Sequence, residues 1–223
     1  MNPVPIKPAF VELMAQRRAD LSAKLTAIFP APRAIVWEIG CGHGHFLERY
    51  AAEFPLRLCL GVDLASERIT RALRKSERGK LLNCHFIRAD ALDFLHALPK
   101  GVTLQEIWVL FPDPWPKKRH HKNRILQPDF FAALAAYAPA GARLYFRTDS
   151  IDYFQAVQAL LPSLKTWEIP KAEEPWPLEH ETVFQARAES YQSLILVRTS
   201  HPAKSAEITA PAVPPPADSR LPA

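Results

Sequence analysis

The residues with the clearest chemical potential lie in one stretch, Phe111–Arg124, which reads FPDPWPKKRHHKNR. Asp113 stands between two prolines and close to Trp115, so the chain is stiff there and the carboxylate is held in place. The basic run that follows contains Lys117, Lys118, Arg119, Lys122 and Arg124. A positioned acid suits catalysis or base recognition, and a basic run suits a polyanion.

A second feature is the glycine-rich segment Glu38-Ile-Gly40-Cys-Gly42-His-Gly44, between an apolar strand pattern and a helical one. Glycines allow a tight turn and a close approach of the backbone to a ligand. The dinucleotide fingerprint GxGxxG would place its third glycine where His45 stands, so a nicotinamide dehydrogenase is disfavoured. Glu38 would repel phosphate and attract a cation. S-adenosylmethionine, which carries a sulfonium and an ammonium group but no phosphate, fits this loop.

Acidic side chains end four successive predicted strands: Glu38, Asp63, Asp90 and Asp113. Each of them alone is more often a cap or a turn residue than a ligand. Together they would line the crevice at the carboxyl ends of the strands, where open α/β sheets bind ligands. There Asp63 would accept hydrogen bonds from the ribose hydroxyls, and Asp90 would bind the adenine amine.

The aromatic and histidine side chains near these motifs have weaker signals. Trp108 lies in a predicted strand and is expected in the core, whereas Trp115 could stack on a base or pack against the protein. His43 and His45 are expected to be exposed spectators of the glycine loop.

The elements that position these residues alternate between strand and helix, which is typical of a doubly wound, mostly parallel α/β sheet. Strands are predicted at residues 34–38, 56–63, 84–88, 104–111, 143–147 and 193–198. Helices are predicted at 10–28, 46–54, 66–78, 130–137 and 151–161, with a short one that ends near residue 98. Ser66 is expected to cap the third of these helices.

The chain of 223 residues is predicted to form one main domain, 33–199. Residues 1–32 would form an irregular lead and an amphipathic helix that packs on this domain. Residues 170–189 make an acidic, proline-rich loop, and the Pro/Ala-rich tail 200–223 is predicted to be disordered because it has almost no large apolar side chain.

Composition narrows the class further. A hydrophobic content of 48% and a charged content of 23% are ordinary for a globular protein, and no apolar run is long enough for a membrane span. No signal-peptide core precedes the domain, which predicts a cytoplasmic protein. The three cysteines form no CxxC pair, so they are expected to be small buried hydrophobes and no metal site is indicated.

The net charge of +5 is concentrated in two places, residues 68–80 and 117–124. Each cluster is either a solvated basic surface or a nucleic-acid contact, and the second, beside Asp113, favours the contact.

These motifs together resemble a known family. Glu38–Gly44 resembles motif I of class I S-adenosylmethionine-dependent methyltransferases, and Phe111–Arg124 resembles, more specifically, the bacterial tRNA (guanine-N7-)-methyltransferase family. The resemblance runs from about residue 34 to 198. It implies a Rossmann-like fold and an RNA-binding enzyme. The enzyme would methylate N7 of guanine at position 46, in the tRNA variable loop, with S-adenosylmethionine as cofactor and as a monomer or homodimer.

The resemblance also assigns residues. The cofactor would be bound by Glu38, Gly40, Gly42, Gly44, Asp63, Asp90 and Asp113, with Asp113 also catalytic. The substrate would be contacted by Lys117, Asp149, Thr182, Val183, Phe184 and Gln185. RNA phosphates would be held by Lys118, Arg119, Lys122 and Arg124. The family's Thr-Lys-Phe-Glu motif reads Thr-Val-Phe-Gln here, which puts RNA or guanine contacts near this motif in doubt.

Two other functions remain open at this stage. Proline-rich acidic corners also occur in methyltransferases that act on exocyclic amines, although those place two prolines together after the acid. A non-catalytic RNA-binding module on a methyltransferase fold is the second alternative. The altered motif at 182–185 favours it, and the glycine loop with its four acids opposes it.

Overall fold

The structure is a computed structural model of the chain that describes residues 8–180 and 185–203. The predicted tail from residue 204 onward lies outside the described residues, and so do Thr182, Val183 and Phe184.

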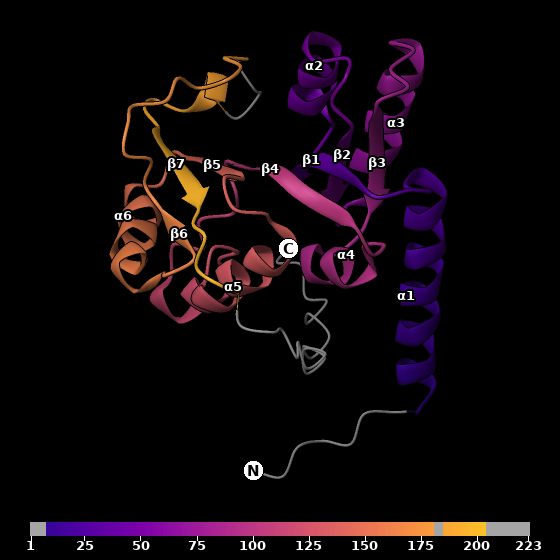
Figure 1. Ribbon diagram of the computed structural model, residues 1–223, viewed down its shortest axis with the longest axis horizontal. Coiled ribbons are helices and arrows are strands. Elements are labelled where there is room, and N and C mark those ends of the chain that lie inside the picture. Colours follow the sequence, from indigo (N-terminus) through magenta and orange to yellow (C-terminus); the bar gives the residue numbers. More distant parts are fainter. Residues whose placement is uncertain (1–7, 181–184, 204–223) are drawn as a thin grey trace, which may run out of the picture.

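A seven-stranded sheet forms the centre of the molecule, with the order β3-β2-β1-β4-β5-β7-β6 (Figure 1). Its strands are β1 Arg33–Ile39, β2 Cys59–Asp63, β3 Cys84–Arg88, β4 Val102–Leu110, β5 Arg143–Thr148, β6 Trp167–Glu168 and β7 Gln192–Arg198. The first five run parallel, and β7 is antiparallel to both β5 and β6. The doubly wound, mostly parallel sheet expected from the sequence is thus confirmed.

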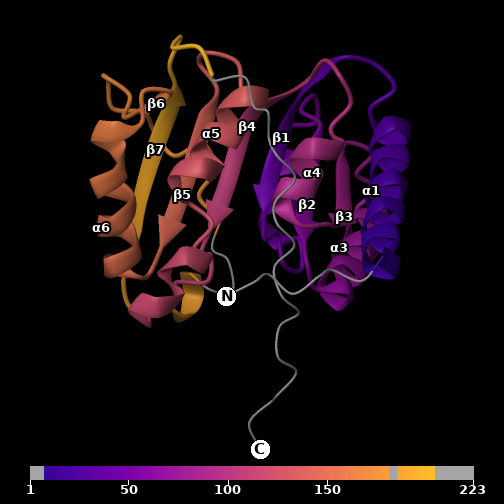
Figure 2. The same ribbon diagram turned by 90° about the horizontal axis from the view of Figure 1, so that it is seen from below.

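The described residues form six α-helices, of which α1 precedes β1 and the other five connect the strands (Figure 2). They are α1 Pro8–Ile28, α2 His45–Glu53, α3 Ser66–Arg78, α4 Ala91–Ala97, α5 Pro128–Tyr137 and α6 Ile151–Leu160. Short 3₁₀ turns are formed by Lys118–Asn123, Leu161–Ser163 and Gln185–Arg187. Side chains from α1, α4, α5 and α6 share one core on one face of the sheet, and those from α2 and α3 share a second core on the other.

The central strands are mostly apolar because both faces are covered, and Glu38 of β1 and Glu106 of β4 are among their buried charged residues. Trp37 and Trp108 are completely buried in adjacent strands, which confirms the core position expected for Trp108. Cys41, Cys59 and Cys84 are also buried, as expected.

Some boundaries differ from the predictions. The strand expected from residue 56 begins only at Cys59, and Leu56 is fully exposed, since pairing with β1 and β3 starts at Cys59. Ser66 is the first helical residue of α3 rather than its cap; Ala65 holds the cap position without a side-chain bond. The two-residue strand β6 was not predicted, because it has no hydrophobic run of its own.

Helix α1 packs on the domain through only part of its length. Leu21 and Leu25 are buried, and Arg18 forms an ion pair with Asp93 of α4 at 3.0 Å. Val11 and Leu13 are exposed, and the first turns of the helix project beyond the sheet in Figure 1. A helix thus forms at Pro8–Ile28, and it packs on the domain through its second half.

The loop after β6 covers the part of the second face that α2 and α3 leave open. Trp176 lies edge-on against Trp108 and Tyr145, with ring centroids 5.4 Å apart in both pairs. Leu178 packs on the same core. An acidic loop therefore takes the place of a helix over β4, β5 and β7.

Candidate active site

The acids predicted at the strand ends do lie at one edge of the sheet. Glu38 is the residue before last in β1, Asp63 ends β2, and Asp90 follows β3 by two residues. Asp113 follows β4 by three residues. Because these strands are parallel neighbours in the order β3-β2-β1-β4, their carboxyl ends form a continuous rim.

The glycine loop joins this rim to helix α2. Gly40, Gly42 and Gly44 have φ values of 69°, 54° and 72°, a left-handed conformation that favours glycine. A Cβ atom on Gly44 would lie 2.6 Å from the Phe86 ring, so this glycine also permits the packing of the loop on the sheet. A Cβ on Gly40 or Gly42 would meet nothing within 4 Å, so these two backbones border open space.

Glu38 is buried beneath this loop. It is 4% exposed, and burial raises the pKa of its carboxyl group to about 8. The backbone N–H of Leu47 donates a hydrogen bond that opposes this shift, and the charge of Asp63 adds to it. Within the described residues, Oε2 of Glu38 has no hydrogen-bond partner. A buried oxygen in this state is suited to a cationic or donor group of a ligand.

Asp63 is held rigidly by the backbone. Its Oδ2 accepts from the N–H of Gly42 at 3.0 Å, and its Oδ1 accepts from the N–H of Ala65 at 2.7 Å. Arg68, in the first turn of α3, lies 3.7 Å from Oδ2. These contacts tie the glycine loop, the end of β2 and the start of α3 together.

Asp90 and Asp113 differ from the two buried acids. Asp90 is exposed and caps α4, because its Oδ1 accepts from the N–H groups of Leu92 at 2.8 Å and Asp93 at 3.3 Å. Asp90 therefore has a structural role as a helix cap, in addition to its predicted role as an adenine ligand. Asp113 is exposed, and in the described part of the chain it makes no hydrogen bond or ion pair.

The turn around Asp113 is strained on both sides. Phe111 has φ 48° and Trp115 has φ 47°, which side chains other than glycine rarely adopt. Strained backbone of this kind clusters at functional sites. The N–H of Phe111 donates to the carbonyl oxygen of Arg147 at 2.7 Å, so the turn starts from a fixed point on β5. Trp115 is half-buried, with its ring edge-on to His120 at 5.9 Å, which leaves both of its predicted roles open.

The basic run divides into two parts. Lys117, Lys118, Arg119 and Lys122 are exposed. Arg124 is only 3% exposed, donates to the carbonyl oxygen of Pro114 at 2.8 Å and pairs with Asp152. Its guanidinium also lies over the Tyr153 ring. Arg124 therefore ties the Asp113 turn to α6 and does not face solvent for the phosphate contact that we expected of it.

Of the remaining predicted substrate residues, the structure describes Asp149 and Gln185. Asp149 is exposed directly after β5, on the same rim as the other acids. The side-chain oxygen of Gln185 accepts from Arg147 at 3.3 Å, and its side-chain nitrogen donates to the Tyr191 hydroxyl at 3.1 Å. Gln185 is thus held within the protein, and the neighbouring three residues of its motif lie outside the described chain.

Sequence reasoning did not find the residue that organises this region, Arg147. It is 4% exposed and forms a bidentate pair with Glu179 in which both distances are 2.9 Å. Its guanidinium lies between the rings of Trp176, at 4.2 Å, and Tyr191, at 4.7 Å. The only sequence signal is that Pro175-Trp176-Pro177 repeats the Pro-Trp-Pro of the Asp113 turn.

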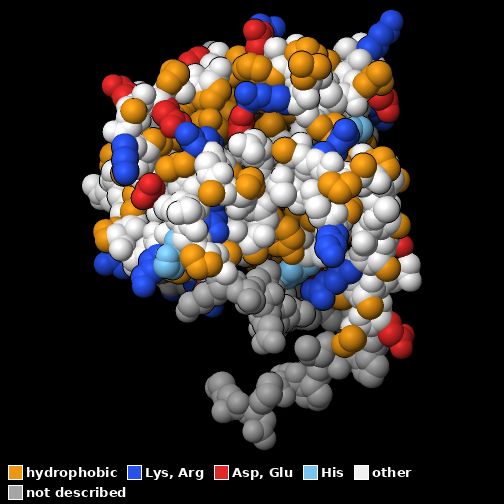
Figure 3. All heavy atoms as spheres, viewed as in Figure 1, with side chains coloured by type: hydrophobic (Ala, Val, Ile, Leu, Met, Phe, Trp, Pro, Cys, Tyr) orange, Lys and Arg blue, Asp and Glu red, His pale blue; other side chains and the backbone are white. Residues whose placement is uncertain are grey.

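Hydrophobic side chains gather in a hollow near the top of the space-filling view, with charged side chains at its rim (Figure 3).

Among the described helices, none is both long and apolar enough to cross a membrane. The described residues also contain no cluster of His, Cys, Asp or Glu side chains arranged to hold a metal ion.

The strand order with one antiparallel strand, the glycine loop and the row of acids define a class I, Rossmann-like methyltransferase. Comparison with solved structures agrees on the fold. The 16S rRNA methyltransferase KamB superposes with a TM-score of 0.57 at 19% identity, covering 79% of this chain and 93% of that one. TrmN from Thermus thermophilus gives 0.54 at 18% identity, covering 79% of this chain and 48% of that one.

Sequence comparisons identify the family. The family model described as "Putative methyltransferase" matches residues 32–195. The tRNA (guanine-N(7)-)-methyltransferase of Treponema pallidum is 37% identical over 182 residues, 78% of this chain and 72% of that protein. The tRNA (guanine-N(7)-)-methyltransferase of Thermosynechococcus vestitus is 32% identical over 190 residues, which cover 78% of this chain and 88% of that protein. The one from Syntrophotalea carbinolica is 34% identical over 146 residues, and the match spans only 63% of its length. The chain belongs to the tRNA (guanine-N(7)-)-methyltransferase family.

Proposed function

We propose that this protein transfers a methyl group from S-adenosylmethionine to N7 of guanine in tRNA. Membership of the family supports the reaction, and the relatives named above carry that activity in their names. The observation that carries the proposal is the Asp113 turn: an unpaired, exposed carboxylate, held by strained backbone at the rim of the sheet and followed by four exposed cations.

The residues of the rim fit S-adenosylmethionine. The unpartnered, buried Oε2 of Glu38 would accept from its ammonium group, and the open backbones of Gly40 and Gly42 would border it. Asp63 is fixed by two backbone N–H groups and keeps lone pairs for the ribose hydroxyls. When bound, the cofactor supplies a methyl group on a positively charged sulfur, which is an electrophile.

The reaction requires little general acid–base catalysis from the protein's own residues. Guanine N7 carries an in-plane lone pair and no proton, so methylation needs no strong general base. Orientation and electrostatics are then the main contributions. Asp113 would accept hydrogen bonds from N1–H and the 2-amino group of guanine, which sets the edge of the base that faces the methyl group. The negative charges of Asp113 and Asp149 would stabilise the positive charge that the ring gains. Lys117 would contact the substrate beside them.

The exposed side chains of Lys118, Arg119 and Lys122 would hold RNA phosphates, a contribution that is independent of sequence and weakened by salt. Arg124 has the separate task of keeping the turn in place.

The test is incubation of the purified protein with labelled S-adenosylmethionine and an unmodified tRNA transcript, followed by nucleoside analysis. We expect 7-methylguanosine as the labelled product. Label in a methylated adenine, or at an exocyclic nitrogen of guanine, would identify a different methyltransferase. Binding of tRNA without any label transfer would indicate a non-catalytic RNA-binding protein.

A further inference from the structure

Helix α3 presents a row of cations on one face. Arg68, Arg71, Lys75 and Arg78 follow each other at intervals of three, four and three residues, which places them on one side of the helix. The first and last of these residues are ten positions apart, or about 15 Å along the helix. The three arginines are exposed and Lys75 is half-buried.

This row begins at the rim of acids, and one of its members contacts the glycine loop. Arg68 is 3.7 Å from Asp63. Lys75 Nζ donates to the carbonyl oxygen of His43 at 3.2 Å and lies 2.8 Å from the ring nitrogens of His45. The pKa of His43 is lowered, mainly by burial and then by the charges of Arg71, Lys75 and Arg68. The two histidines predicted as spectators therefore border a strongly positive surface.

The positive charge of this row is largely uncompensated. Within the described chain, no carboxylate lies within 4.0 Å of the charged groups of Arg71, Lys75 or Arg78. Glu67 precedes Arg71 by four residues, the usual spacing for a helical ion pair, yet the pair is not formed. Glu48 of α2 offsets part of the Lys75 charge. Apart from Arg68, the cations of this face therefore have no ion-pair partner in the described chain.

We propose that this face of α3 binds the phosphates of the RNA strand whose base enters the active site. Helix α3 follows β2, on one side of β1, and the basic run at Lys117–Lys122 follows β4, on the other side. The two cationic surfaces flank the end of β1 at the rim, so a polyanion held by both would cross the rim with the reacting base between them. This inference rests on the proposed function for the identity of the polyanion.

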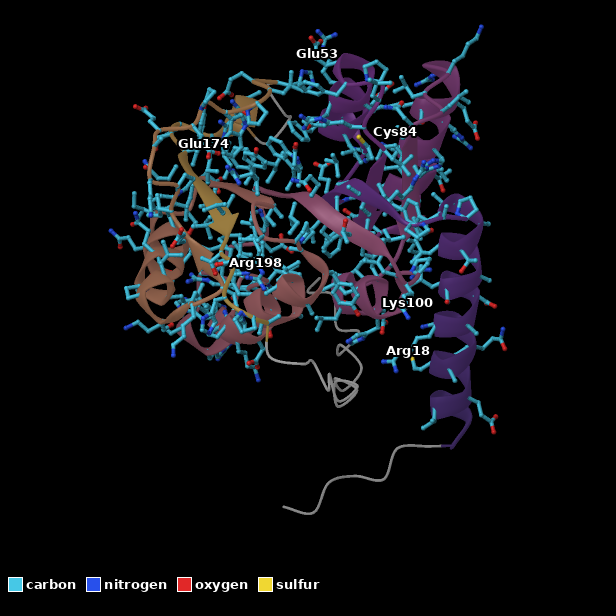
Figure 4. The ribbon with its side chains drawn as sticks, viewed as in Figure 1. Arg18, Glu53, Cys84, Lys100, Glu174 and Arg198 are labelled. Carbon is cyan, nitrogen blue, oxygen red and sulfur yellow. The ribbon has the colours of Figure 1, made fainter. Side chains whose placement is uncertain are left out.

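The test measures tRNA binding by fluorescence anisotropy at several salt concentrations. The variant R71Q/R78Q removes two charges that make no contact with the glycine loop. The variant R71K/R78K keeps the charges. The control R33Q/K100Q removes two exposed charges from the opposite edge of the sheet, where the N–H of Arg33 donates to the carbonyl oxygen of Gly101; Figure 4 shows Lys100 beside α4 and away from α3.

We expect R71Q/R78Q to reduce the slope of log K against log salt by about two and to weaken tRNA binding by about tenfold or more near 0.1 M salt. R71K/R78K and R33Q/K100Q should keep the wild-type slope. In R71Q/R78Q, the KM for tRNA should rise while kcat is unchanged. The affinity of this variant for S-adenosylmethionine, measured by calorimetry, should equal that of the wild type.

An unchanged slope in R71Q/R78Q would overturn the proposal and would leave an acidic protein partner as the better explanation of the row. A loss in the control equal to that in R71Q/R78Q would also overturn it, because the effect would then be one of net charge. The binding assay does not depend on catalysis, so a failure to form 7-methylguanosine would refute the proposed function separately from this surface.

Discussion

Among the acids of the rim, Asp113 is exposed and without a partner in the described chain, so its replacement should affect chemistry rather than folding. We expect Asp113→Asn to lower kcat/KM for tRNA roughly a hundredfold, the size of effect seen when one positioned electrostatic contact is lost. The melting temperature should change by no more than about 2 °C. Steady-state kinetics and thermal unfolding measure the two quantities.

Asp129→Asn is the matched control, since it neutralises an exposed acid in the first turn of α5. Its kcat/KM should equal that of the wild type. Near-normal turnover in Asp113→Asn, with the fold intact, would remove Asp113 from the mechanism.

Glu38 should make the stability of the free protein depend on pH. Its pKa is about 8 in the folded state against 4.5 as the ordinary value, because burial disfavours the charged form. The unfolded state therefore loses this proton first, and stability falls as pH rises from about 4.5 to 8. The full cost is on the order of 4–5 kcal/mol at most. The free energy of unfolding, measured with denaturant, should differ less between pH 6 and pH 8.5 in Glu38→Gln than in the wild type. Equal differences would contradict the assignment.

The same carboxyl group should couple cofactor binding to proton release. A cationic ammonium group beside Glu38 favours the ionised form, which lowers the raised pKa. At pH 7, binding of S-adenosylmethionine should release close to one proton from this site. Calorimetry in buffers of different ionisation enthalpy measures this number. The release should be absent in Glu38→Gln, whose affinity for the cofactor should also fall; a wild type that releases no proton would refute the coupling.

At the scale of elements, the loop between β6 and β7 is held to the sheet by Arg147 and Glu179. Arg147 is buried, so removal of Glu179 leaves a desolvated cation without its bidentate partner. We expect Glu179→Ala to destabilise the protein by about 1–3 kcal/mol. It should also speed amide exchange at 170–180 and 188–191, while exchange in β1, β2 and β4 stays slow. Hydrogen exchange read by mass spectrometry reports both regions.

Glu173→Ala provides the comparison for this loop. Glu173 is exposed in the same segment, and in the described chain it forms no ion pair. Its exchange pattern should match the wild type. If both variants loosen the loop equally, the Arg147 pair is not what holds it.

At the scale of the whole molecule, the three cysteines report how the domain opens. All are buried, and burial raises the pKa of each thiol, that of Cys59 to about 12. Alkylation should therefore require opening of the structure. Cys59 and Cys84 lie in β2 and β3 and should react together, at the rate of unfolding. Cys41 lies in the glycine loop and should react faster, with protection by S-adenosylmethionine. Mass spectrometry of timed alkylation would contradict this if Cys41 were unaffected by the cofactor.

Much of the fold could be predicted because its causes are local. The apolar runs that become strands, the glycines that adopt left-handed φ values and the acids at or near the ends of the first four strands are all encoded within a few residues. The predictions are wrong where strand pairing sets the boundary of an element. Leu56 was predicted to begin a strand, but β2 begins at Cys59, where pairing with β1 and β3 begins.

The sequence was sufficient to predict the mostly parallel sheet, the positions of Glu38, Asp63, Asp90 and Asp113 along one rim, and the family. Which charged side chains face solvent became known from the three-dimensional fold. Arg124 lies in the same basic run as Lys122 but is buried against Asp152, 28 residues away, and Arg147 binds Glu179, 32 residues away. The two basic clusters look alike in sequence, yet folding alone places α3 beside the glycine loop. The physical reason is that burial and pairing of charges depend on contacts between distant segments, and no local pattern records those contacts.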